Sequence, residues 1–254
     1  MTSADLPQAE ARSAKQRNSE DDDLAASLSG LSVLSAARLP LIEMLTRVAH
    51  YAVQAIPGAD GAGLTLIEQN GADTIATTAG FVGAIDAVQY RLNEGPCITA
   101  AREGVTVISG SLGEDPRWPR FSPRVARMGV HSVVSLPLLT PDEVVGAMNV
   151  YAHREDAFDA RAAELGELFA VPAAVAVQNA RVLEDTRRNA QRLQALLDER
   201  VVIERAVGII MSRSGVDAPE ALAQLTKLSQ DDQIKLVQLA RNLIDEAVRR
   251  ARDR

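Results

Sequence analysis

The chain has 254 residues, of which 46% are hydrophobic and 24% are charged, so it can bury a core as one large domain or two smaller ones. With a net charge of −7, no run of about 18 apolar residues and no N-terminal apolar segment, it is expected to be cytoplasmic and free of membrane contact. Cys97 is the only cysteine, which excludes an internal disulfide and a metal site built on paired thiolates.

The N-terminal residues 1–23 are polar, charged and nearly free of large apolar side chains. Such a segment does not bury enough apolar surface to offset the entropy cost of ordering, and it is predicted to be a disordered tail. A helical pattern follows over residues 23–56, with apolar residues at steps of three and four. The residues of this face are Leu41, Met44, Leu45, Val48, Ala49 and Ala52.

Residues 57–158 are typical of a mixed α and β domain. The segments GAGLTLIE and DTIATTAG are strand candidates, and Asn70–Gly71 between them favours a two-residue hairpin. Helices are predicted over residues 81–89 and 96–104, followed by a strand in VTVIS and by RWPRFSPRVARMG as a loop leading to a short helix. HSVVSLPLL and EVVGAMNVYA predict two further strands. This order indicates an antiparallel sheet with helices beside it.

One long helix is predicted from Asp159 to Met211, because apolar residues recur there at steps of mostly three or four and Pro172 is the only expected kink. It would span roughly 80 Å, far more than a small domain covers. Such a helix favours a parallel two-stranded coiled coil in a homodimer. Arg200 interrupts the heptads, so the strict coiled coil is not expected beyond Leu197.

Two shorter helices are predicted after Gly215. Asp217 followed by Glu220 is a capping-box arrangement that opens the first of them, and Ser229 followed by Asp232 is expected to open the second. The C-terminal part also differs in charge. Residues 187–254 hold 13 Lys and Arg against 10 Asp and Glu, a net of +3, whereas residues 1–186 hold 14 against 24, a net of −10. This asymmetry is expected of a protein that binds a polyanionic partner. The alternative is that the charged residues only form solvated helix faces.

Several motifs resemble known families. Residues 38–186 resemble a GAF domain of actinobacterial regulators in the segments YRLNEGPCITAAREG, VHSVVSLPL and VVGAMNVYAHREDAF. Residues 187–254 resemble an ANTAR domain in the segments ERVVIERAVGIIMSRSG and LSQDDQIKLVQLA. The pairing is that of GAF–ANTAR transcription antitermination regulators. We therefore expect an α+β chain in which a GAF sensor domain over residues 24–186 is joined by a long helix or coiled coil to a three-helix ANTAR domain over residues 187–254.

The resemblance implies a function in RNA binding. Dimeric ANTAR domains bind paired stem-loops in nascent messenger RNA and prevent a terminator hairpin from forming, under control of the GAF half. The candidate RNA-binding residues are Arg200, Arg205, Arg213, Lys227, Lys235 and Arg241. The chain departs from the family pattern at Val207, Leu222 and Thr226, where lysine, an aromatic residue and arginine are usual, and it has no aromatic residue after position 186. The alternative is a ligand-binding or scaffold dimer whose ANTAR half does not bind RNA.

For the GAF half, the resemblance implies a pocket between sheet and helices that holds an unknown small ligand or contacts a protein. Its candidate residues are Cys97, His131, Ser132, Asn149 and Tyr151. Cys97 is interpreted as a buried small residue, with an oxidant sensor as the alternative. His131 and His153 have no spacing that predicts a metal or haem site. Without a nucleophile elbow, P-loop or dinucleotide fingerprint, we expect neither an enzyme nor a cofactor.

Overall fold

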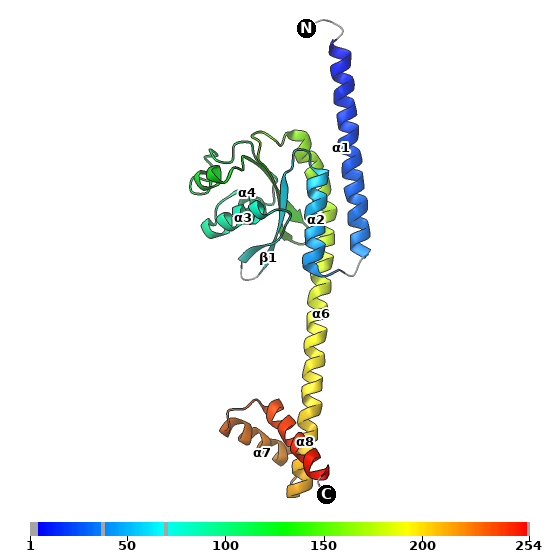
Figure 1. Ribbon diagram of the computed structural model, residues 1–254, viewed down its shortest axis with the longest axis vertical. Helices are drawn as coiled ribbons and strands as arrows, with labels where there is room; N and C mark the ends of the chain where they lie inside the picture. Colours follow the sequence, from blue (N-terminus) through cyan, green and yellow to red (C-terminus); the bar gives the residue numbers. More distant parts are fainter. Residues whose placement is uncertain (1–4, 37–38, 69–70, 253–254) are drawn as a thin grey trace. The chain divides into compact units, whose positions relative to one another are not determined.

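The computed structural model of the protein describes residues 5–36, 39–68 and 71–252 (Figure 1). The chain divides into two compact units, of which the first ends at Glu184 and the second begins at Asp185. Helix α6 (Ala160–Ser214) is a single element of 55 residues that begins in the first unit and ends in the second. The long helix predicted from Asp159 to Met211 is therefore present, with Pro172 inside it. None of the described helices is long and apolar enough to cross a membrane.

The first unit alternates helices and strands, as predicted. Before α6 its elements are α1 (Asp5–Ala36), α2 (Leu41–Ala55), β1 (Gly61–Glu68), β2 (Gly71–Thr77), α3 (Gly80–Leu92), α4 (Pro96–Glu103), β3 (Val107–Ser109), α5 (Ser122–Val125), a 3-10 turn (Ala126–Met128), β4 (Ser132–Leu139) and β5 (Val144–Ala152). The α+β class is confirmed. The single helical stretch expected up to residue 56 is two helices, because Pro40 caps the N-terminus of α2 with an extended backbone.

The strands form one antiparallel sheet in the order β2-β1-β5-β4-β3. The predicted pairing of β1 with β2 is confirmed, with Glu68 opposite Gly71. The turn residue Asn70 lies outside the described residues. In the centre of the sheet β5 pairs with both β1 and β4, so that Asn149 lies opposite Gly63 on one side and opposite Ser135 on the other.

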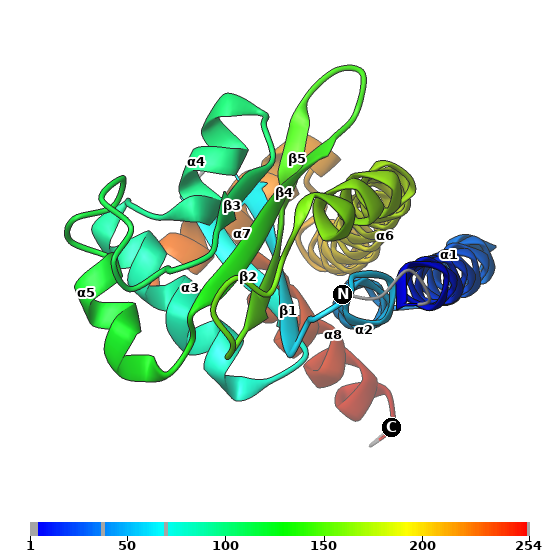
Figure 2. The ribbon, with the colours of Figure 1, turned by 90° about the horizontal axis from the view of Figure 1, so that it is seen from above.

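The two faces of the sheet carry different layers of helices (Figure 2). Alternate residues such as Leu64, Leu136 and Met148 point into an apolar core shared with α1, α2 and α6. On the opposite face lie α3, α4 and α5, and a second core there includes Val133 and Tyr151. The polar side chains of β1, β4 and β5 described below point toward this second layer.

Helix α1 corrects the prediction of a disordered tail for residues 5–23, while residues 1–4 of that prediction lie outside the described residues. The structure describes a helix from Asp5, whose later part buries Leu24, Leu31 and Leu34 in the core beside α2. Its acidic part is held by Arg161 at the start of α6, which pairs with Glu20 at 4.0 Å and also with Asp21. The apolar content of the tail does not reveal these ion pairs, because Arg161 follows Asp21 by 140 residues in the sequence.

The second unit is a bundle of three helices, as predicted: the end of α6, α7 (Ala218–Asp231) and α8 (Leu236–Arg252). Its small core consists of Ala206, Val207, Ala221, Leu225 and Ala240. Gly215 follows α6 at a φ of +71°, a conformation that favours glycine. The predicted cap of α7 is confirmed, since the Asp217 carboxylate accepts a hydrogen bond from the Glu220 N–H at 3.0 Å.

The predicted start of α8 at Ser229 is wrong. Ser229 lies inside α7, and its hydroxyl donates to the Ile234 carbonyl at 2.6 Å, so that it closes the turn after α7 instead of opening the next helix. Gln233 takes a φ of +56° in this turn, and α8 begins at Leu236. Ser and Asp favour both helix starts and turns, so the local sequence did not distinguish the two.

Candidate functional site

A network of buried polar side chains lies between the sheet and α3. At its centre is Asp86, whose side chain is fully buried. Its Oδ1 accepts hydrogen bonds from the Tyr151 hydroxyl at 2.5 Å and from the side-chain amides of Gln89 and Asn149 at 3.1 Å each. Charge-assisted hydrogen bonds of this kind compensate a carboxylate for part of its lost hydration.

The network extends to Cys97 at the N-terminus of α4. The Gln89 Oε1 accepts a hydrogen bond from the Cys97 N–H at 2.8 Å, which ties α3 to α4. The Cys97 Sγ lies 3.7 Å from the Thr65 Oγ1 and 3.9 Å from the Tyr90 hydroxyl. Sulfur, hydroxyl and amide groups from two strands and two helices thus meet in one buried cluster.

Two glycines give this cluster its space. A side chain at Gly63 in β1 would place its Cβ 2.8 Å from the Asp86 Oδ2, so only glycine lets the carboxylate lie against the strand. Gly95 has a φ of +142°, and a Cβ there would lie 2.3 Å from the Gln89 Oε1. Both positions therefore require glycine for the network to form.

Three of the five predicted pocket residues, Cys97, Asn149 and Tyr151, meet in this network. Ser132 does not, because successive strand residues point to opposite faces and Ser135, not Ser132, shares the face of Asn149, to which it donates at 2.9 Å. The Ser132 hydroxyl instead donates to the Arg154 carbonyl at 2.6 Å. His131 precedes β4, and its ring lies 3.8 Å from the Glu155 carboxylate.

Asp86 and Gln89 are the residues that the sequence argument missed. They lie on the buried face of α3 together with Val82 and Ile85. A carboxylate and an amide three residues apart on an otherwise apolar helix face are a signal that the helical pattern over residues 81–89 already contained.

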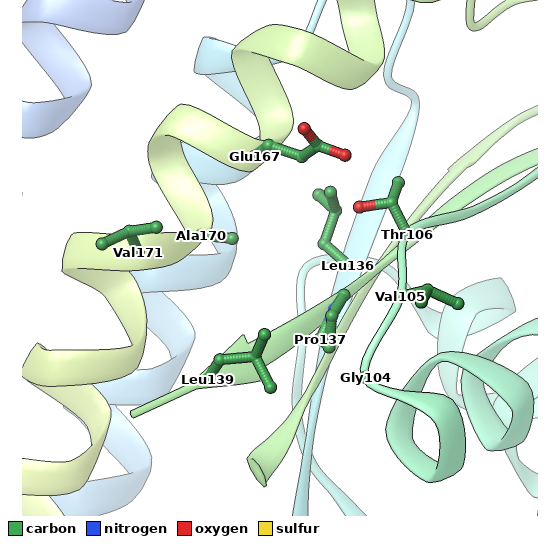
Figure 3. A pocket seen from close by; sticks show the side chains of 9 residues that line it. All are labelled: Gly104, Val105, Thr106, Leu136, Pro137, Leu139, Glu167, Ala170 and Val171. Atoms are coloured by element: carbon green, nitrogen blue, oxygen red, sulfur yellow. The ribbon is translucent and has the colours of Figure 1, made fainter. Parts of the chain in front are cut away.

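A surface pocket of about 420 Å³ lies on another side of the first unit, beside α6 (Figure 3). It lies between α6, β4 and the segment that leads from α4 to β3. Leu136, Pro137 and Ala170 in its wall are buried. Its lining residues are Gly104, Val105, Thr106, Leu136, Pro137, Leu139, Glu167, Ala170 and Val171. None of them belongs to the buried polar network.

The second unit has two hollows on different sides of α6. Arg205 and Arg213 line one of about 460 Å³, together with Ile244 of α8. Arg200 lines the other, an apolar groove of about 790 Å³, and pairs with Glu204 at 2.8 Å. Five residues separate Arg200 from Arg205, which is about 140° around a helix of about 3.6 residues per turn. The structure therefore does not bring Arg200, Arg205 and Arg213, the three candidate RNA-binding arginines of α6, together on one face.

Lys227, Lys235 and Arg241 are exposed in the second unit. They lie on α7, in the segment before α8 and on α8. Among the residues that the structure describes, none of the three is in an ion pair. Together with Arg205 and Arg213 they leave cationic groups free for a polyanion.

Comparison with protein families identifies both parts of the chain. The GAF domain family matches residues 39–178, more than half of the chain, and the ANTAR domain family matches residues 191–244. The protein is a GAF–ANTAR regulator. GAF domains are sensor domains and ANTAR domains are RNA-binding antitermination output domains, so its domain content is regulatory and not catalytic. No curated protein sequence matches the chain.

Solved structures resemble the GAF part. The GAF domain of a phosphoenolpyruvate-protein phosphotransferase (ptsP) from Coxiella burnetii is 15% identical, with a TM-score of 0.51 over 64% of this chain and 97% of that chain. Free methionine-R-sulfoxide reductase from Neisseria meningitidis is 16% identical, with a TM-score of 0.48 over 63% of this chain and 91% of that chain. The first likeness shows the fold.

Two departures of the ANTAR domain from the family pattern line the apolar groove of the second unit. Val207 is only 9% exposed and belongs to the core, and Leu222 is half-exposed at the edge of the groove. Thr226 donates its hydroxyl to the Leu222 carbonyl at 2.8 Å. Gly208 has open space beside it, because among the described residues no atom outside the neighbouring backbone of α6 lies within 4 Å of the Cβ it would carry.

The thiol of the GAF–ANTAR protein is held in its neutral form. Burial, followed by the charge of Asp86, raises the pKa of Cys97 to about 12. The same two causes raise the pKa of Tyr151 well above its ordinary value. Because the thiolate is the reactive form and Cys97 is 1% exposed, these findings favour the interpretation as a buried small residue over an oxidant sensor.

A pH dependence of stability follows from Cys97. The folded state keeps the thiol protonated up to about pH 12, whereas in the unfolded chain it ionises near pH 8.5. Its contribution to the free energy of unfolding is therefore complete below about pH 8.5 and falls by about 1.4 kcal/mol per pH unit above it. Urea unfolding of the wild type and Cys97→Ala between pH 7 and 11 measures this. A difference between the two proteins that stays constant with pH would contradict it.

Removal of the Tyr151 hydroxyl should destabilise the GAF domain. Tyr151→Phe takes one donor from the Asp86 carboxylate and one acceptor from the Gln89 amide, both in a buried site, at an expected cost of about 1–3 kcal/mol. Urea unfolding measures the loss. Tyr51→Phe is the matched control, because no hydrogen bond of the half-buried Tyr51 hydroxyl is found among the described residues. Equal losses in the two variants would mean that the network adds nothing to stability.

Proposed function

We propose that the protein is a homodimeric transcription antiterminator whose GAF domain senses a small ligand or a protein and controls an ANTAR dimer that binds paired stem-loops in nascent messenger RNA. The observation that carries this proposal is the ANTAR domain itself, a three-helix unit in which Arg205 and Arg213 line one hollow. Exposed arginines suit contacts to RNA phosphates and stacking on splayed bases. Lys227, Lys235 and Arg241 are further candidates for contacts to RNA. A function in antitermination places the protein in the cytoplasm with the nascent transcript.

The dimer is supported by apolar side chains on α6. Leu168, Val175, Val182 and Leu196 are 52%, 49%, 55% and 55% exposed, and they follow one another at steps of seven or of two sevens. Exposed apolar residues in a heptad pattern favour a second helix of the same kind. Asn189 occupies the remaining step, and a polar residue in such a position fixes register and oligomeric state at a cost in stability.

The proposed control acts through α6. Within the GAF domain this helix buries Leu165, Phe169 and Val177, and at its other end it buries Ala206 in the ANTAR core. A ligand that changes how α6 packs on the sheet would therefore act on a helix that is also part of the output domain. In a dimer, the proposed consequence is a changed register or separation of the two long helices.

A gel-shift titration with a leader RNA that contains twin stem-loops tests this function. We expect a complex at low salt that weakens steeply as salt is raised, because phosphate contacts release counterions. An RNA with only one of the two stem-loops is the control, since a dimer that grips both should bind it more weakly. Absence of any complex at low salt would remove the antitermination proposal.

The second candidate function is a scaffold or ligand-binding dimer that does not bind RNA. It is favoured by the apolar groove of the ANTAR unit, where Val207 and Leu222 stand in place of a usual cation and a usual aromatic residue. The same titration distinguishes the two, because a scaffold dimer would form no complex with the RNA at any salt concentration.

A further inference from the structure

The pocket beside α6 has a polar end and an apolar end. In Figure 3 the Glu167 carboxylate and the Thr106 hydroxyl lie at one end, and Pro137 and Leu139 lie at the other. Leu136 and Ala170 complete an aliphatic wall. A ligand that fits this arrangement has a short aliphatic body and a polar head.

The charge of the polar end selects the head group. Glu167 is exposed, and in the described part of the chain no cation pairs with it. The Thr106 side chain likewise has no hydrogen-bond partner among the described residues. A carboxylate beside a free hydroxyl attracts a hydrogen-bond donor that carries a positive charge. The chemistry of the pocket therefore matches an ammonium group on an aliphatic chain.

We propose that this pocket is the ligand site of the sensor domain and that its ligand is a small aliphatic amine. The inference rests on the proposed sensor function and names its site and its ligand class. A pocket of about 420 Å³ lies within the usual range of small-molecule sites. Because Ala170 and Val171 of α6 form one wall and Leu136 of β4 another, a bound amine touches both the sheet and the helix that continues into the ANTAR domain.

The buried polar network is the less suitable site. Asp86, Gln89, Cys97, Asn149 and Tyr151 are each at most 1% exposed. Their polar groups already form hydrogen bonds with one another. A ligand among them would have to break those bonds and desolvate a buried carboxylate further. The pocket beside α6 needs no such rearrangement.

A second copy of the chain is the competing occupant. The apolar heptad positions of α6 include Leu168 and Val175, and Val171 at the apolar end of the pocket lies between them, at steps of three and four. Glu167 lies about 100° around the helix from Leu168. A partner helix along this seam would therefore cover Val171 and leave the polar end of the pocket, with Glu167 and Thr106, open to a small ligand.

Saturation-transfer NMR on the full-length protein with n-pentylammonium, 1-pentanol and pentanoate as probes tests the proposal. We expect saturable binding that is tightest for the amine, weaker for the alcohol and weakest for the acid, with up to about a fivefold difference between amine and acid at low salt, as for an exposed ion pair. Glu167→Gln should remove the preference for the amine and leave binding of the alcohol unchanged. Thr106→Trp should block all three probes, because Thr106 lines the pocket but is not part of α6, whereas Val33→Trp, at an exposed valine of α1, should block none.

Three results would overturn the proposal: no saturable binding of the amine, equal binding of amine and acid, or a fall to monomer mass in Thr106→Trp alone. The last would mean that a second copy covers the pocket. The RNA titration run on the same preparation separates this inference from the proposed function. RNA binding without amine binding would remove only the ligand site, and amine binding without RNA binding would remove only antitermination.

Discussion

Charge reversal at Arg205 and Arg213 should strongly weaken the proposed binding of RNA by this protein. Both arginines line the same hollow of the ANTAR unit, on a different face of α6 from Arg200. Each lost phosphate contact lowers the slope of log K against log salt by about 0.7–0.9, and each introduced glutamate adds repulsion. For Arg205→Glu with Arg213→Glu we expect a loss of affinity of about 100-fold or more at 0.1 M salt. Gel-shift titrations at four salt concentrations measure both the affinity and the slope.

The matched control is Arg102→Glu with Arg154→Glu, which makes the same change in net charge on exposed arginines of the GAF domain. It should weaken RNA binding only slightly. Arg200→Ala tests separately whether Arg200 contributes to RNA binding, because Arg200 pairs with Glu204 and lines the apolar groove. A similar loss in the GAF control would show that net charge alone drives binding, and an unchanged affinity in Arg205→Glu with Arg213→Glu would show that RNA uses another face.

Replacement of Leu193 and Leu196 by aspartate should convert the proposed dimer into a monomer. The two leucines are 62% and 55% exposed in the single chain, and neither belongs to its cores, so the monomer should keep its fold. In a two-stranded coiled coil, four leucines would become buried, at about 1.5–3 kcal/mol each. We expect the dissociation constant to rise by at least about 1,000-fold, which light scattering after size-exclusion chromatography at micromolar concentration detects.

Two controls accompany this variant. Val33→Asp with Leu228→Asp introduces the same two charges at exposed apolar residues outside α6, and it should leave the mass unchanged. Circular dichroism checks that both proteins keep their helices. A wild-type protein of monomer mass, or a Leu193→Asp and Leu196→Asp variant of dimer mass, would contradict the coiled coil.

Local sequence patterns predicted most of the fold. The apolar steps of three and four predicted α2 and α6, the Asn70–Gly71 pair predicted the pairing of β1 with β2, and Asp217 predicted the start of α7. These features depend on neighbours along the chain, which the sequence displays directly. The failures at residues 5–23 and at Ser229 arose where side chains distant in sequence, or a turn, competed with the local pattern.

The sequence by itself determined the division into two parts, through the change in charge and apolar pattern along the chain, and the family, through the resemblance of its motifs. The tertiary structure alone decided which polar groups meet. Asn149 and Tyr151 reach Asp86 from positions 63 and 65 residues away, because β5 lies beneath α3 in the folded sheet. It also decided that Arg200 lies apart from Arg205, and that Val207, in the most characteristic motif of the ANTAR domain, is buried. Such contacts depend on the packing of distant elements, which no local pattern specifies.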